Sequence, residues 1–128
     1  MLKIQECRKH YLQFKNSEKD TLTKLISNNT YVMSPHATIR QTHKVILNRE
    51  IRDTLKDYKI VEYHYKFGDN RVLIRSNKSY KHTNLCLVLS LNRGEIITVY
   101  DNSEDDRHET LDLKIYDRNL DIKKMLNN

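Results

Sequence analysis

The spacing of apolar residues changes part-way along the chain, and the first pattern is helical. Over residues 2–15 the apolar positions recur every three or four residues, which is typical of one face of a helix. These positions are Ile4, Cys7, Tyr11 and Phe14. Ser17-Glu18-Lys19-Asp20 then resembles a capping box, which favours a second helix through Ile26. We therefore expect two helices before residue 30.

A third helix is predicted after the short apolar stretch at residues 31–33. Ser34 is a good N-cap, and Pro35 suits the first helical position because its missing N–H would have no partner there. We expect this helix to end near Lys44 and to turn three residues inward: Ile39, Thr42 and Ile46. Asn48 can cap a fourth helix that buries Ile51 and Leu55.

From Lys59 onward the period falls to two, which indicates strands. Strands are predicted over residues 60–67, 71–76, 85–91 and 95–101, with tight turns at Gly68-Asp69-Asn70 and Asn92-Arg93-Gly94. The predicted fold class is α+β, with the N-terminal helices packed on one face of a four-stranded antiparallel meander. A candidate edge strand follows at residues 111–115, and a terminal helix at residues 119–126.

Alternation along the strands assigns side chains to the two faces of this sheet. Those expected to face the helices are Val61, Tyr63, Tyr65, Phe67, Leu85, Leu87, Leu89, Leu91, Ile97 and Val99. Those expected on the opposite face are Glu62, His64, Ser90, Thr98, Tyr100 and, in one register, Arg71 and Arg75. This second face is polar, cationic and aromatic, which suits the floor of a binding cleft.

Length and composition fit one ordered domain. The chain has 128 residues, of which 38% are hydrophobic and 31% charged, with two glycines and one proline. We divide the expected domain into a helical extension (1–30), a core (31–101) and an acidic loop with a C-terminal segment (102–128). No pattern predicts an oligomeric state.

The net charge of +6 is unevenly distributed and favours polyanions as partners. Between Asp101 and Asp112 six acids and one arginine give −5, so the other residues sum to +11. The acidic segment has two interpretations. It is a solvated loop, or it is a flap that competes with phosphate near a binding site.

The remaining composition excludes several classes of protein. Cys7 and Cys86 lie far apart without a CxxC pair, which argues against a zinc ribbon or a disulfide framework. The N-terminus lacks the apolar run of a signal peptide, and no segment is long enough to span a membrane. We expect a cytoplasmic protein without membrane association, without a metal site and without a cofactor.

Candidate chemistry appears first on the third predicted helix. His36, Arg40 and His43 follow i, i+4, i+7 spacing, which sets them along one stripe. Two imidazoles and a guanidinium can supply proton transfer and an anion clamp without a metal. The next helix carries a cationic stripe: Arg49, Arg52 and Lys56. Each of these residues also has an ordinary structural explanation, and only their combination points to function.

The order of elements resembles a bacterial and phage group of small domains placed with the barnase, EndoU, colicin-type and RelE-like (BECR) ribonucleases. The segments that carry the resemblance are Met33-Ser34-Pro35-His36-Ala37 with Arg40, Arg49-Glu50-Ile51, Ile60-Val61-Glu62-Tyr63 and Glu95-Ile96-Ile97-Thr98-Val99-Tyr100. It covers about residues 31–101. The N-terminal extension and the acidic tail depart from the group's pattern.

The resemblance implies a toxin-like, metal-independent endoribonuclease that cleaves RNA through a 2′,3′-cyclic phosphate. The implied catalytic residues are His36 as base, Arg40 as phosphate clamp, His43 as acid and Thr98 at the far wall. The cationic stripe and the polar sheet face add candidate substrate-binding residues: Arg49, Arg52, Lys56, His64, Arg75 and Tyr100. His64 is also a second candidate acid. An antitoxin or host protein is a further expected partner. The alternative is a non-catalytic phage or bacterial accessory protein that binds nucleic acid or a host protein through the same sheet face.

Overall fold

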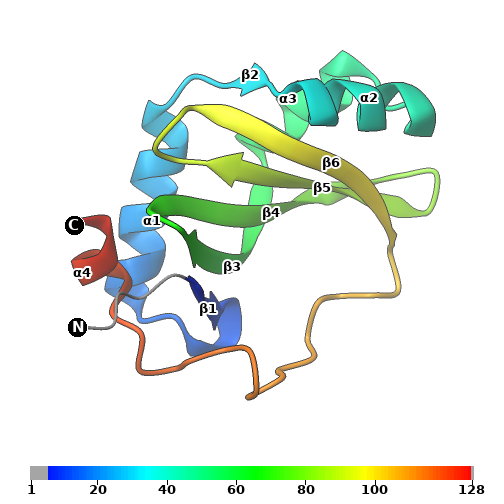
Figure 1. The fold of residues 1–128 in the computed structure, drawn as a ribbon. Helices are drawn as coiled ribbons and strands as arrows, with labels where there is room; N and C mark the ends of the chain where they lie inside the picture. The colour runs from blue at the N-terminus through cyan, green and yellow to red at the C-terminus, as the bar shows by residue number, and fades with distance from the viewer. Residues whose placement is uncertain (1–5, 128) are drawn as a thin grey trace.

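The computed structural model describes residues 6–127 and shows an α+β fold built on a six-stranded mixed sheet (Figure 1). The strands are β1 (Glu6–His10), β2 (Val32–Met33), β3 (Tyr58–Lys66), β4 (Asp69–Tyr80), β5 (Thr83–Ser90) and β6 (Glu95–Ser103), in the order β1-β3-β4-β5-β6-β2. The α+β class is confirmed, but a four-stranded sheet is wrong. Strand β1 extends the meander at one edge, and β2, parallel to β6, extends it at the other.

The predicted N-cap at Ser34 is confirmed, whereas Ser17 and Asn48 lie inside helices that Lys15 and Leu47 precede. The helices are α1 (Asn16–Asn28), α2 (Pro35–Lys44), α3 (Asn48–Lys56) and α4 (Ile122–Leu126), with a 3-10 turn η1 (Tyr11–Gln13). The Ser34 hydroxyl accepts from the Ala37 N–H at 2.9 Å, which fixes the start of α2. Of the three residues predicted to face inward, Ile46 is buried, whereas Thr42 is exposed and Ile39 is 56% exposed; within α2 the buried residue is Ala37. The helix contacts mainly β6 near the edge of the sheet, so only a narrow stripe of the helix surface is buried.

The N-terminal segment forms a strand where its spacing predicts a helix. Cys7 pairs with Tyr65 and Lys9 with Tyr63 in an antiparallel ladder along the edge of β3. The predicted Ile4 lies outside the described residues. The ladder is long-range, since more than fifty residues separate the partners, and tertiary pairing of this kind overrides a weak local periodicity.

Two β-bulges change the predicted faces of the sheet. The bulge between Ile60 and Glu62 leaves Ile60 in the main core and moves Val61 to the opposite face. The second bulge brings Ile96 rather than Ile97 opposite Leu89. A third departure is Phe67, which is 68% exposed because the β3–β4 turn places it at a φ of 47°.

The main core joins one face of the sheet to residues from every helix. Its helical members are Leu22 and Ile26 from α1, Ala37 from α2, Ile51 from α3, and Ile122 and Met125 from α4. Its strand members include Tyr63, Val72, Ile74, Leu85, Leu87, Leu89 and Val99. The other face, called here the open face, carries a smaller apolar cluster: Val61, Leu73 and Cys86, with Val88 and Tyr100 packed against it.

The chain after β6 turns away from the sheet and returns toward β1, so that α4 lies beside α1 (Figure 1). The predicted edge strand is absent, because Leu113 and Ile115 are exposed and only an isolated bridge joins Arg8 to Tyr116. The Asp117 N–H donates to the Arg8 carbonyl at 2.9 Å. The terminal helix is shorter than predicted and begins at Ile122.

Candidate functional site

The predicted stripe on α2 is separate from the polar network of the sheet. His36 and His43 are exposed, and Arg40 is half-buried with an Nε that has no hydrogen-bond partner. Within residues 6–127 no hydrogen bond or ion pair joins these three side chains to one another. In this part of the chain no polar partner therefore fixes the orientation of either histidine.

The cationic stripe on α3 lies on an exposed helix surface. Arg49, Arg52 and Lys56 are all exposed, while Ile51 and Thr54 are turned into the core. Lys56 also lines a pocket between α3, α1 and the start of β3. Because α3 packs on β4 and β5 through core residues of the main face, the stripe is not part of the open face.

The open face gathers the polar residues expected from the alternation of the strands. Cross-strand pairing sets Arg71 beside both His64 and Ser90, and sets Thr98 beside Val88. Since paired residues share a face, the ladder places these side chains on the face opposite the main core. Thr98 and Tyr100 were expected to share one site with the α2 stripe. They lie on the open face of the sheet.

A continuous line of polar residues crosses four strands on this face. Arg8 of β1 pairs with His64 of β3, His64 with Arg71 of β4, and Arg71 with Ser90 of β5. We call this line the His64 row. Directly opposed residues have Cβ atoms about 5 Å apart. A histidine therefore lies between two guanidinium groups, one on each neighbouring strand.

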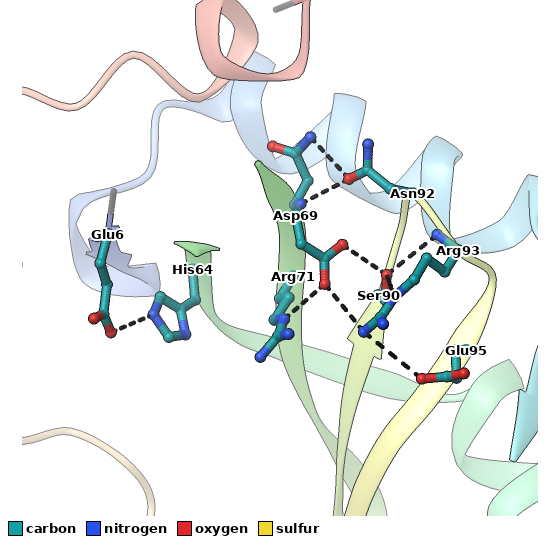
Figure 2. Close-up of polar contacts among 9 residues, drawn as sticks. Glu6, His64, Asp69, Arg71, Ser90, Asn92, Arg93 and Glu95 are labelled. Atoms are coloured by element: carbon teal, nitrogen blue, oxygen red, sulfur yellow. Dashed lines mark hydrogen bonds and ion pairs between the residues drawn. The ribbon is translucent and has the colours of Figure 1, made fainter. Parts of the chain in front are cut away.

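A carboxylate from β1 orients the histidine. His64 Nε2 lies 2.7 Å from Glu6 Oε1, as Figure 2 shows. Burial lowers the pKa of His64, and Arg8 and Arg71 lower it further, although the bond to Glu6 opposes them. The same bond lowers the pKa of Glu6. A neutral imidazole that donates its Nε2–H to this carboxylate has the free lone pair on Nδ1.

A second carboxylate holds the neighbouring cation. Asp69 accepts from Arg71 Nε at 2.7 Å and from the Ser90 hydroxyl at 2.7 Å, and Arg93 lies 3.5 Å from it (Figure 2). Neither terminal nitrogen of Arg71 makes a hydrogen bond to another residue of the described chain. Asp69 thus fixes the side chain through Nε and leaves the two terminal nitrogens for an anion.

Glu62 supplies a third carboxyl group next to the row. It lies two residues before His64 on the same face of β3, which places their Cα atoms about 6.5 Å apart. Burial raises the pKa of Glu62, whereas Arg8 at 3.9 Å and the hydroxyl of Tyr116 at 3.2 Å oppose that rise. A raised pKa gives this carboxyl a larger protonated fraction than an exposed glutamate has.

Arg75, a predicted substrate ligand, is used to anchor the C-terminal segment. It is 6% exposed and donates to Asn84 Oδ1 at 2.9 Å, to the Ser103 carbonyl at 3.0 Å and to the Asp106 carbonyl. Its Nη1 also lies 2.8 Å from His108 Nδ1. These contacts occupy the guanidinium. Tyr100 is likewise packed in the small apolar cluster, and burial raises the pKa of its hydroxyl.

The residues that sequence reasoning missed are Glu6, Arg8 and Asp69. The first two were assigned to a helix, and only the pairing of β1 with β3 brings them to His64. The pattern Gly68-Asp69-Asn70 predicts a turn, whereas Asp69 is the first residue of β4. Residues 6–10 contain a single apolar residue, Cys7, so no period-two pattern in the sequence indicates this strand.

Three further observations complete the description. In residues 6–127 no group of three or more His, Cys, Asp or Glu side chains is arranged to hold a metal ion. No helix in that range is both long and apolar enough to cross a membrane. Comparisons with known protein families, curated proteins and solved structures find no match to this chain.

Proposed function

We propose that the chain is a metal-independent endoribonuclease whose catalytic centre is the His64 row. The observation that carries this proposal is a histidine held by Glu6 and set between Arg8 and Arg71. Cleavage of RNA by its own 2′-hydroxyl needs a base, an acid and positive charge at phosphorus, and no covalent nucleophile from the protein. The row and Glu62 contain each of these groups.

The first step uses the free lone pair of His64. Nδ1 removes the proton of the 2′-hydroxyl, and the resulting oxygen attacks the adjacent phosphorus to form a new P–O bond. Glu6 accepts the Nε2–H of the ring and stabilises the imidazolium that forms. Because burial keeps the pKa of His64 below its ordinary value, the ring is available as a base at neutral pH.

The second step breaks the bond between phosphorus and the 5′-oxygen. Arg8 and the terminal nitrogens of Arg71 stabilise the negative charge on the phosphorane oxygens. Protonated Glu62 gives its proton to the departing 5′-oxygen, so the products are a 2′,3′-cyclic phosphate and a 5′-hydroxyl end. Glu62 then recovers a proton from solvent, and His64 releases the one it accepted.

This proposal keeps the reaction expected from the resemblance and moves its centre from α2 to the sheet. The α2 stripe lacks a partner that orients either histidine, whereas His64 has a carboxylate at 2.7 Å. The resemblance alone assigns His36, Arg40 and His43 to catalysis. Cells would require protection from such an activity, so an antitoxin-like protein is a proposed partner, as is RNA.

The test is cleavage of end-labelled RNA in excess EDTA by wild type and by two double variants. Arg8→Ala with Arg71→Ala removes the proposed clamp, and Arg49→Ala with Arg52→Ala removes the same charge from exposed positions on α3. We expect the first pair to lower the rate by about 10²-fold or more and the second to change it only a few-fold. Cleavage lost equally in both pairs would contradict the proposal. RNA bound but left intact by wild type would favour the non-catalytic binding protein.

A further inference from the structure

A pocket of about 1020 Å³ lies apart from the His64 row. It is lined by η1, by residues along the length of α1, by the C-terminal end of α3, by the start of β3 and by Asn77 of β4. This volume is at the upper end of the range of about 300–1,000 Å³ that small-molecule sites occupy. The pocket is therefore large enough to take most of a mononucleotide.

The lining of the pocket is strongly cationic. Four lysines contribute to it, one that precedes α1 and one each from α1, α3 and β3: Lys15, Lys19, Lys56 and Lys59. The single carboxylate in the lining is Asp57, whose Oδ1 accepts from Asn77 Nδ2 at 2.8 Å. Within residues 6–127 none of the four ammonium groups forms an ion pair. Four positive charges around one hollow favour an anion.

The N-terminus of α1 adds to this preference. The residue that precedes the helix is Lys15, which provides no side-chain acceptor for the first amides. In the described part of the chain the N–H groups of Asn16 and Ser17 have no acceptor, and Asn16 lines the pocket. Such free amides at the start of a 13-residue helix favour a phosphate oxygen.

Three aromatic side chains also line the pocket. They are Tyr11, Phe14 and Tyr58. Lys59 Nζ lies 3.8 Å from the centroid of the Tyr11 ring. Burial raises the pKa of the Tyr58 hydroxyl, and the Ser27 side chain opposes that rise. Rings of this kind stack on nucleobases without strong base preference.

We infer that this pocket binds a nucleotide, with its phosphate at Lys19 and the start of α1 and its base against the aromatic side chains. A free mononucleotide and the 5′-phosphorylated end of an RNA strand both carry a phosphate close to a base, so both match this pocket. The site shares no residue with the His64 row, so the inference stands independently of the proposed reaction.

The test is calorimetric titration of the whole chain with AMP, inorganic phosphate and adenosine. Binding of AMP that weakens with salt, with weaker binding of phosphate and little of adenosine, supports the inference. A 5′-phosphorylated, 2′-O-methylated trinucleotide, which the proposed reaction cannot cleave, separates the two sources. Tighter binding of the trinucleotide assigns the site to a strand end, and equal or weaker binding assigns it to a free nucleotide. Absence of AMP, phosphate and trinucleotide binding at millimolar concentration would overturn the inference.

Matched variants on α1 test whether AMP binds in this pocket. Lys19→Ala should weaken AMP binding by about tenfold, as expected for loss of a charge-assisted hydrogen bond. Lys24→Ala removes the same charge from α1 outside the pocket and should leave the affinity within about twofold. Equal effects of Lys19→Ala and Lys24→Ala would show that AMP binds elsewhere.

Discussion

Lys9 Nζ lies 2.7 Å from Glu18 Oε1, and both side chains are almost fully buried. The ammonium also donates to the Leu120 carbonyl at 2.7 Å. Glu18 in turn accepts from the backbone N–H groups of Lys15 and Ile122. One ion pair therefore joins β1, α1 and the C-terminal segment, and it holds the strand that carries Glu6 and Arg8.

Replacing Lys9 should destabilise the protein strongly. Lys9→Met leaves the buried carboxylate of Glu18 without its cation, which typically costs about 3–5 kcal/mol. Urea unfolding followed by circular dichroism measures this change. Lys24→Met, at an exposed position, is the control and should stay within about 0.5 kcal/mol. A loss below about 1 kcal/mol for Lys9→Met would show that the pair does not stabilise this junction.

The same pair predicts a loss of stability in acid. Burial alone would raise the pKa of Glu18, but the bonds from Lys9 and from the two amides outweigh it and lower the pKa below 4.5. The unfolded chain then binds more protons, so this contribution is complete above about pH 4.5 and is lost as the pH falls through the folded-state pKa. The difference in unfolding free energy between wild type and Glu18→Gln should shrink across that range. A difference that stays constant from pH 6 to pH 3 would contradict this linkage.

The pKa of His64 should respond to Glu6. Burial lowers it below 6.5 in the wild type, and the bond to Glu6 limits that decrease. Glu6→Gln should therefore lower the pKa further, because a neutral amide stabilises imidazolium less than a carboxylate does. NMR titration of the imidazole resonances measures both values. A higher pKa in Glu6→Gln would show that Glu6 does not partner the ring.

Arg75 should control access to the C-terminal segment. It bonds to the carbonyls of Ser103 and Asp106 and contacts His108, so Arg75→Leu removes the anchor of this region. Trypsin cleavage after Arg107 should then be faster by about tenfold or more, since bonds to a charged donor are lost. Arg52→Leu, on the exposed surface of α3, should leave the rate unchanged. Equal rates in Arg75→Leu and wild type would mean that other contacts hold the segment.

Local signals were sufficient for the elements that depend on neighbouring residues. Ser34-Pro35 marks the start of α2, and Asn48 is the first residue of α3. The predicted turns are found at residues 67–68, between β3 and β4, and at residues 91–94, between β5 and β6. Capping and turn formation act over three or four residues, so a single sequence contains them. The candidates on the open face, His64 among them, followed from alternation along these strands.

Long-range pairing explains what the sequence could not predict. Strand β1 forms because β3 offers an edge more than fifty residues away, and it brings Glu6 and Arg8 to His64. The bulges at Ile60 and at Val88 likewise depend on the partner strand. The first moves Val61 to the open face, and the second sets Ile96 rather than Ile97 opposite Leu89. The capture of Arg75 by residues 103–108 depends on the path of a segment without regular secondary structure.

The most direct measurement compares His64→Gln with His36→Gln in single-turnover cleavage of labelled RNA in excess EDTA. Both variants remove one imidazole, and circular dichroism confirms that each is folded. If His64 is the base, His64→Gln should lower the rate by about 10²–10⁴-fold, and His36→Gln should leave it within a few-fold of wild type. Fragments of the wild-type reaction should end in 2′,3′-cyclic phosphate. Full activity in His64→Gln, or a loss confined to His36→Gln, would contradict a catalytic centre on the sheet.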